Sequence, residues 1–226
     1  MRHATGRQPA LLWAFAAVAL VELVAVALDV RAVQWLAKPL LAPLLLVWLW
    51  RVRGRFDAVA VGLVFAAAGD VALLVSGQPA FLLGMACFLG TQVAFTTAFL
   101  RHRRPPVVAV VGYLLLWAGA NALLWGQLGA LRLPVLGYSL ALSVMAATAT
   151  GVSRQAAVGG ALFLVSDLLI GVDAAGATLP GHGLLVMTTY IGALVLITTA
   201  WAGRPDPSSR SVSSAADLRP TDGVRS

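Results

Sequence analysis

The sequence predicts an all-α protein, a polytopic bundle of eight transmembrane helices. Of the 226 residues, 60% are hydrophobic and only 11% are charged, and the mean hydropathy is +0.88. Soluble domains carry about 25% charged residues, so this composition indicates a chain whose solvent is lipid. The hydrophobic residues form continuous runs without the alternation of barrel strands, which favours helices over a membrane β-barrel.

Eight hydrophobic runs are long enough to be considered as spans, because a helix needs about 20 apolar residues to cross the hydrocarbon core. Several runs are shorter than this, so we expect their ends to extend into the membrane interface. The expected spans are residues 11–28, 36–50, 56–75, 81–100, 107–125, 133–150, 156–173 and 183–201.

The basic residues fall mainly on one side of this arrangement. Arg31, Lys38 and Arg132 lie on one side, and the other thirteen of the sixteen lie opposite. Because cytoplasmic loops are enriched in Lys and Arg, the bias predicts a multi-pass protein of the inner (plasma) membrane with both termini cytoplasmic. We expect residues 1–202 to form the membrane domain and residues 203–226, rich in Ser, Pro, Asp and Arg, to be a disordered cytoplasmic tail.

Two acidic residues lie deep inside apolar runs, Asp70 in VGLVFAAAGDVALLV and Asp167 in GGALFLVSDLLIGV. A carboxylate near mid-bilayer costs about 2.5–3.5 kcal/mol on insertion scales, so such a residue is a functional-site candidate. Gly62 and Ala66 share the helical face of Asp70, and Gly160 shares that of Asp167. Small residues mark helix contacts in membranes, so we expect both acids to face the bundle interior.

Other polar residues fall in the same outer half of the expected spans or near their middle. We expect these residues, with Ser166 beside Asp167, to contact the substrate: Glu22, Lys38, Gln92, Asn121, Tyr138 and Tyr190. Structural roles are the alternative for each one, such as snorkelling for Lys38 and interhelical hydrogen bonding for Glu22.

The chemistry that these residues support is acid–base catalysis or proton movement. Two carboxyls held close together cannot both ionise easily, so one can donate a proton while the other activates water. The same pair could carry protons through a transporter. The single Cys87 and the three scattered histidines argue against a metal site and a Ser–His–Asp site, no cofactor motif is found, and arginines between runs do not indicate a nucleic-acid partner.

A weak internal similarity suggests a parallel repeat of four plus four helices. Pro39 precedes Asp70 by 31 residues, and Pro134 precedes Asp167 by 33. The displacement corresponds to four helices, an even number that preserves orientation in the membrane.

Four short motifs occur in order along the chain: KPL at 38–40, GD at 69–70, FxxGxxxF at 81–88 and FxxSD at 163–167. Together they resemble the YhhN-type lysoplasmalogenase family over about residues 10–200. The chain departs from the family pattern at Gln92, Phe95 and Ala193.

The resemblance implies an eight-helix integral membrane hydrolase that needs no cofactor. Its activity would be cleavage of the vinyl-ether bond of a lysophospholipid, giving a fatty aldehyde and a glycerophospho-base. The resemblance places the site at Lys38, Asp70, Asp167 and Tyr190. A proton-coupled transporter and a non-catalytic lipid-binding protein are the alternatives.

Overall fold

The computed structural model describes residues 8–174, 176 and 179–204, and all regular secondary structure in those residues is helical. A short 3₁₀ turn at Gly129–Leu131 precedes the sixth α-helix. The helices are α1 Gln8–Ala27, α2 Arg31–Arg53, α3 Ala58–Leu74, α4 Gln78–His102, α5 Val107–Leu124, α6 Arg132–Ala149, α7 Arg154–Ala174 and α8 His182–Ala202.

The helix boundaries agree with the expected spans within a few residues, with the largest difference in α2. The sequence predicts a span over residues 36–50, whereas α2 runs from Arg31 to Arg53 and continues through Pro39 and Pro43. Backbone hydrogen bonding continues beyond the apolar run, and neighbouring helices allow proline inside a membrane helix. Gly54 ends α2 in the left-handed conformation, at φ 67°.

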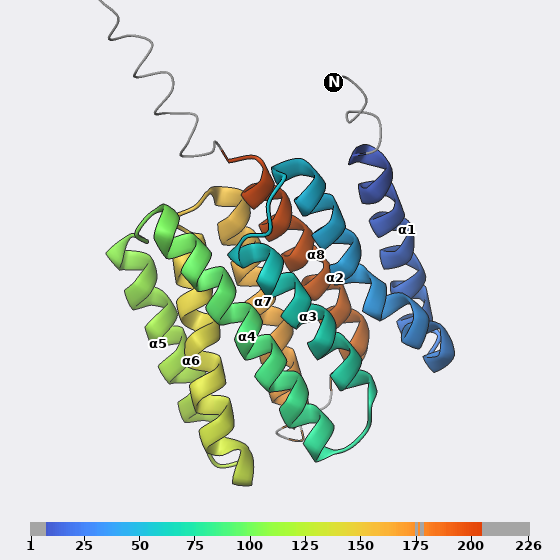
Figure 1. Cartoon of the computed structure of the whole chain (residues 1–226). Coiled ribbons are helices and arrows are strands. Elements are labelled where there is room, and N and C mark those ends of the chain that lie inside the picture. The colour runs from blue at the N-terminus through green and yellow to red at the C-terminus, as the bar shows by residue number, and fades with distance from the viewer. Residues whose placement is uncertain (1–7, 175, 177–178, 205–226) are drawn as a thin grey trace, which may run out of the picture.

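Seven of the described helices are long and apolar enough to cross a membrane, and α3 is shorter at 17 residues. Its length is about 25 Å against a hydrocarbon core of about 30 Å. Both described chain ends lie at the same end of the bundle (Figure 1), so the chain traverses the bundle an even number of times, and α3 is one traversal. The protein is therefore a multi-pass helical bundle, and eight membrane crossings stay a prediction.

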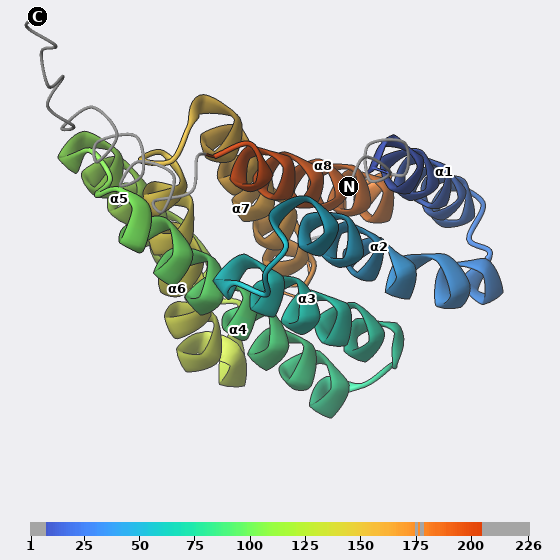
Figure 2. The same ribbon diagram turned by 45° about the horizontal axis from the view of Figure 1, so that its top comes forward.

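Six helices form a closed ring, in which α2, α3, α4, α6, α7 and α8 each contact the next and α8 returns to α2. The other two helices lie outside the ring, α1 beside α2 and α8, and α5 beside α6 (Figures 1 and 2). The ring directs one face of each of its helices toward a shared interior.

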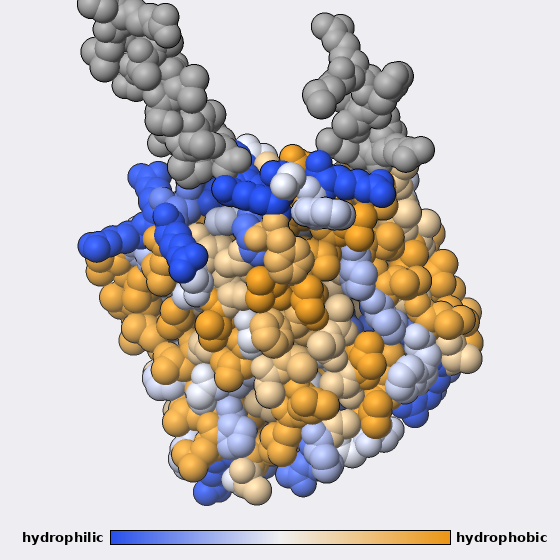
Figure 3. All heavy atoms as spheres, in the orientation of Figure 1, coloured by the Kyte–Doolittle hydropathy of each residue, from blue (hydrophilic) through white to orange (hydrophobic). Residues whose placement is uncertain are grey.

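The interior and the outer surface are both largely apolar, as expected for a protein in lipid. Leu41, Leu45 and Leu49 follow one face of α2 at four-residue spacing and are fully buried. On the face shown in Figure 3, hydrophobic residues form a broad band, and hydrophilic residues gather mainly at the end where both described chain ends lie, with fewer at the opposite end.

The basic residues at that end agree with the expected charge asymmetry, for those that the structure describes. The described members are Arg51, Arg53, Arg55, Arg101, Arg103, Arg104, Arg154 and Arg204. Outside the described residues lie Arg2, Arg7, Arg210, Arg219 and Arg225, as does the expected tail from residue 205 onward. The disordered tail therefore stays a prediction.

Candidate active site

The polar residues singled out in the sequence lie in the half of the bundle away from the described chain ends. Glu22, Asp70 and Asn121 are near the ends of helices that run toward that side, and Lys38 and Tyr138 are near the starts of helices that return. The remaining four lie on α4, α7 and α8, with Gln92 near the middle of its helix: Gln92, Ser166, Asp167 and Tyr190.

Asp70 is held in a buried polar cluster contributed by four helices. Its side chain is 1% exposed, and Tyr190 on α8 donates a hydrogen bond to Oδ2 at 2.7 Å. Lys38 Nζ on α2 lies 4.0 Å from Oδ1. Glu22 on α1 is fully buried and close enough to Lys38 and Asp70 for their charges to interact. Lys38 thus lies beside the carboxyls of Glu22 and Asp70, two residues whose separation from it in the sequence does not indicate contact.

Asp167 has a similar tyrosine partner but more open surroundings. Tyr138 on α6 donates a hydrogen bond to Asp167 Oδ2. The amide of Gln92 lies near the Tyr138 hydroxyl without reaching hydrogen-bond geometry. Asp167 lines a cavity, whereas Asp70 is not among the residues that line it. Of the two carboxyls, the cavity therefore reaches Asp167 alone, and the two acids do not share one hollow.

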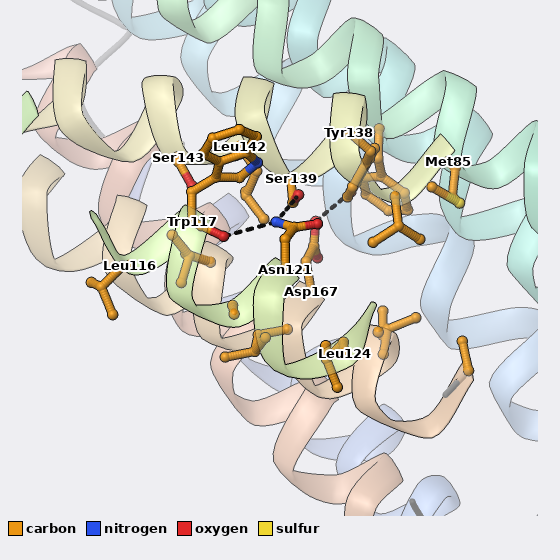
Figure 4. A pocket seen from close by; sticks show the side chains of 18 of the residues that line it. Met85, Leu116, Trp117, Asn121, Leu124, Tyr138, Ser139, Leu142, Ser143 and Asp167 are labelled. Carbon is orange, nitrogen blue, oxygen red and sulfur yellow. Dashed lines mark hydrogen bonds between the residues drawn. The ribbon is translucent and has the colours of Figure 1, made fainter. Parts of the chain in front are cut away.

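The cavity beside Asp167 has a volume of about 110 Å³ and is lined mostly by apolar side chains of α4, α5, α6 and α7. Figure 4 shows its polar side. Asn121 Nδ2 donates to Ser139 Oγ at 3.1 Å and to the Trp117 carbonyl at 2.8 Å. Asn121 is the buried residue that α5 contributes, so this amide attaches an otherwise lipid-facing helix to α6. An apolar cavity with a few polar groups on one wall suits a lipid chain with one reactive polar group.

Three aromatic rings connect the two acidic sites. Phe88, Phe163 and Tyr190 contact one another edge to face, with centroids 5.7–6.1 Å apart. Phe88 also lines the cavity, while the Tyr190 hydroxyl binds Asp70. Asp70 and Asp167 are close enough for their charges to interact. The aromatic cluster therefore separates the buried Asp70 from the cavity that Asp167 lines.

The glycine of the GD motif permits this packing. A Cβ at Gly69 would lie 2.7 Å from the Phe88 ring, and one at Gly84 would lie 2.6 Å from Leu73. Both glycines bring α3 against α4, so GD and FxxGxxxF form two sides of one helix contact. Phe88 reaches the aromatic cluster because nothing larger than hydrogen stands at position 69.

Several buried polar atoms have no hydrogen-bond partner among the described residues. Those that belong to the candidate site are both carboxyl oxygens of Glu22, Oδ1 of Asp70, both amide atoms of Gln92 and Oδ1 of Asn121. Buried polar groups are usually satisfied, so this concentration is consistent with bound water or a catalytic role at the site.

Other residues have roles that the sequence did not indicate. Ser166 is buried and donates to the Val186 carbonyl at 3.2 Å, which links α7 to α8. Ser139 and Trp117 were not singled out, although both contact Asn121. Ser139 directly follows Tyr138 near the start of α6, which is only a weak signal in the sequence. Its contact with Asn121 depends on the position of α5 beside α6. Within the described chain, no group of three or more His, Cys, Asp or Glu residues could hold a metal ion.

The fold and this site define a multi-pass helical membrane protein with two buried carboxyl–tyrosine contacts. The sequence over residues 33–201 matches the YhhN family, so the chain belongs to that family. This confirms the resemblance carried by the four motifs.

Curated relatives include three mammalian proteins, each named Lysoplasmalogenase TMEM86B. The one from Sus scrofa is 32% identical over 143 residues, which cover 63% of this chain and 62% of that protein. The one from Homo sapiens is 29% identical over a stretch that covers 72% of this chain and 71% of that protein. The one from Rattus norvegicus is 30% identical, covering 71% and 69%. The match spans somewhat less than two thirds of the Sus scrofa protein, and no solved structure matches this chain.

Proposed function

We propose that this protein hydrolyses the vinyl-ether bond of lysoplasmalogen-like lysophospholipids. The observation that carries the proposal is the position of Asp167, on the wall of an apolar cavity with a tyrosine behind it and a second carboxyl nearby. The names of the curated relatives support the same activity. The membrane supplies the substrate, because a single-chain lipid can reach the bundle from the side.

The reaction needs an acid, a water molecule and a group that stabilises positive charge. The acid gives a proton to the outer vinyl carbon, and the π electrons form the new C–H bond. The inner carbon and the ether oxygen then share a positive charge as an oxocarbenium ion. Water attacks that carbon and loses a proton to a carboxylate, and the hemiacetal breaks into an aldehyde and an alcohol. Acid–base groups typically contribute about 10²–10⁴-fold to such steps.

The surroundings of the two aspartates favour different roles. The ion pair with Lys38 favours the carboxylate form of Asp70, whose negative charge would stabilise the cation although Asp70 does not line the cavity. Asp167 faces the cavity beside a tyrosine hydroxyl, a position that suits the proton donor. Lys38 would tune Asp70 or meet the lipid phosphate, Glu22 would act on Lys38 and Asp70 through its charge, and Asn121, Gln92 and Tyr190 would position the substrate.

The test is product formation by the purified full-length protein in uncharged detergent. We expect aldehyde and glycerophospho-base from a 1-alkenyl lysolipid, and none from its 1-acyl and 1-alkyl counterparts, by mass spectrometry. In D₂O, the aldehyde should carry deuterium on the carbon next to its carbonyl, because protonation occurs there.

Replacement of either aspartate should remove this activity. Asp70→Asn and Asp167→Asn should each lower kcat by at least about a hundredfold, since each removes an acid–base group. Asp173→Asn is the matched control, because Asp173 is exposed at the end of α7. Full activity in both Asn variants would contradict the assignment, and absence of aldehyde from every vinyl ether would favour a transporter or a lipid-binding protein.

A further inference from the structure

Arg132 lies just beyond one end of the cavity that Asp167 lines, on the side of the bundle away from the described chain ends. It is the first residue of α6, and Ser139, seven residues later on the same helical face, lines the cavity. Its guanidinium lies over the ring of Trp125, 5.7 Å from the centroid. Trp125 directly follows Leu124, which lines the cavity at the end of α5. The Arg132–Trp125 pair therefore lies where α5 ends and α6 begins, next to the cavity.

The end of α5 orients the guanidinium of Arg132 without neutralising it. Nε donates to the Trp125 carbonyl at 2.7 Å, and Nη2 donates to the Gly126 carbonyl at 3.4 Å. Arg132 is partly exposed, and its Nη1 takes part in neither bond. Among the residues that the structure describes, no carboxylate forms an ion pair with it. Because a guanidinium is always charged in proteins, Nη1 can donate to an anion at this place.

The distance between Arg132 and the reacting groups matches the length of the polar part of a lysophospholipid. On α6, Arg132 precedes Tyr138, the hydrogen-bond partner of Asp167, by six residues. Six residues of helix correspond to about 9 Å along its axis. In a 1-alkenyl lysophospholipid, seven bonds separate the outer vinyl carbon, which accepts the proton, from the phosphorus, or about 8 Å in an extended chain. A lipid with its vinyl group at Asp167 would thus bring its phosphate to the level of Arg132.

The size of the cavity favours the same placement of the lipid. The cavity has a volume of about 110 Å³, whereas a cavity of about 150 Å³ holds a single benzene molecule. It can enclose the vinyl ether and the adjoining carbons, but neither a long chain nor a headgroup. The chain would remain against apolar surfaces and lipid. The headgroup would lie at the membrane surface, where α5 ends and α6 begins.

We propose that Arg132 binds the phosphate of the lysophospholipid and so selects phospholipids over uncharged vinyl ethers. The inference rests on the vinyl-ether hydrolysis proposed above and adds the residue that recognises the headgroup. Hydrogen bonds between a guanidinium and a phosphate are charge-assisted and strong. Lys38 is less suited to this role, because α2 contributes no side chain to the cavity and the Lys38 ammonium already lies 4.0 Å from the Asp70 carboxyl. Lys38 would then act on Asp70 alone.

The test measures aldehyde release from two vinyl ethers by the full-length protein, in uncharged detergent at low salt. One substrate is a 1-alkenyl glycerophosphoethanolamine lysolipid, and the other is the 1-alkenylglycerol that lacks the phosphoethanolamine group. We expect kcat/KM of the wild-type protein to be at least about tenfold higher for the phospholipid, as one charge-assisted hydrogen bond can provide. Arg132→Gln should lower kcat/KM for the phospholipid by about the same factor, mainly through KM, because the phosphate is bound equally before and during the reaction. It should leave kcat/KM for the alkenylglycerol within about twofold, since that substrate offers no anion to position 132.

Two further variants separate recognition of phosphate from general effects of charge. Arg132→Lys should keep part of the preference for the phospholipid, because an ammonium still attracts phosphate without the planar contact of a guanidinium. Arg31→Gln is the matched control. Arg31 is exposed at the start of α2, on the same side of the bundle as Arg132, and α2 contributes no side chain to the cavity. Its replacement should leave the preference unchanged, and high salt should reduce the preference of the wild-type protein.

Several results would overturn the proposal. If Arg132 serves only to cap the end of α5, Arg132→Gln would lower turnover of both substrates by the same factor. Equal kcat/KM for the two substrates in the wild-type protein, or an unchanged preference in Arg132→Gln, would contradict recognition of phosphate by this residue. An equal loss of preference in Arg31→Gln would show that the charge of the whole surface sets it. Absence of aldehyde from both substrates would instead contradict the vinyl-ether hydrolysis itself, and the inference with it.

Discussion

Asp70 and Asp167 each accept a hydrogen bond from a tyrosine, but the two pairs differ in their surroundings. Tyr190 and Asp70 are both almost fully buried. Tyr138 and Asp167 line a cavity. A hydroxyl that satisfies a buried carboxyl supports folding, whereas one beside a cavity can be replaced in part by water. The same Tyr→Phe substitution should therefore have different consequences at the two positions.

Tyr190→Phe should lower the free energy of unfolding by about 1–3 kcal/mol, because it leaves a buried carboxyl oxygen unsatisfied. Tyr138→Phe should change stability less and turnover more, since it removes the hydroxyl that is hydrogen-bonded to Asp167, the proposed proton donor. Thermal unfolding and aldehyde release on the same preparations separate the two effects. Tyr113→Phe is the control, because the Tyr113 hydroxyl makes no hydrogen bond to another described residue. Equal losses of stability at positions 138 and 190 would contradict this distinction.

At the level of single residues, the sequence could identify the acids but not their partners. Asp70 and Asp167 stand out because lipid makes an isolated carboxyl costly. Tyr138 and Tyr190 are ordinary residues in apolar runs, and which tyrosine meets which acid depends on the order of helices in the ring. The Tyr190–Asp70 contact joins α8 to α3 across 120 residues of sequence, and no local pattern encodes such a contact.

At the level of elements, the sequence predicted helix positions well, because the thickness of the bilayer fixes the length of an apolar run. It underestimated α2, whose first turns from Arg31 are less apolar and whose prolines suggested an end or a kink. Close helix contacts depend on small residues instead of apolar runs. Gly159 and Gly160 bring α7 against both neighbours, with a Cβ at Gly159 3.0 Å from the Ile197 amide and one at Gly160 3.1 Å from Ala146 Cα.

Gly159→Ala should therefore destabilise the protein, by about 1–3 kcal/mol, because the added methyl group meets backbone atoms that cannot rotate away. Gly112→Ala is the matched control. Gly112 lies on α5 with no atom within 4 Å of an added Cβ, so the substitution should be neutral or slightly stabilising. Comparison of Tm values in one detergent is sufficient. A decrease in Gly112→Ala as large as that in Gly159→Ala would show that the close contacts at position 159 are not the cause of the loss.

At the level of the whole molecule, most helix contacts have the arrangement that a four-helix repeat would produce, although the α1–α8 contact has no comparable α5–α4 counterpart. A shift by four helices converts the α1–α2, α2–α3 and α3–α4 contacts into α5–α6, α6–α7 and α7–α8, and α2–α8 into α6–α4. The two acids then occupy corresponding helices, α3 and α7. This agreement supports the repeat suggested by the prolines and acids, which stays a prediction. The sequence alone did not indicate the closed ring, since ring closure joins α2 to α8 across most of the chain.

The same arrangement gives a prediction for orientation in the membrane. The end of the bundle that carries the chain ends also carries most of the described arginines, so we infer that it faces the cytoplasm of a cell whose plasma membrane holds the protein. The candidate active site would then lie in the outer half of the bilayer.

Cysteine labelling in intact cells tests this orientation, and the single native Cys87 makes it simple to perform. In a Cys87→Ser background, Gln127→Cys lies in the turn between α5 and α6, and Arg103→Cys lies after α4 at the opposite end. A membrane-impermeant maleimide should label Gln127→Cys in intact cells and Arg103→Cys only after the membrane is disrupted. Labelling of both in intact cells, each at the level seen after disruption, would place the two positions on one side and contradict the helix count. A reversed pattern would retain the count but move Asp70 and Asp167 to the cytoplasmic half, where the lipid substrate would have to come from the inner leaflet.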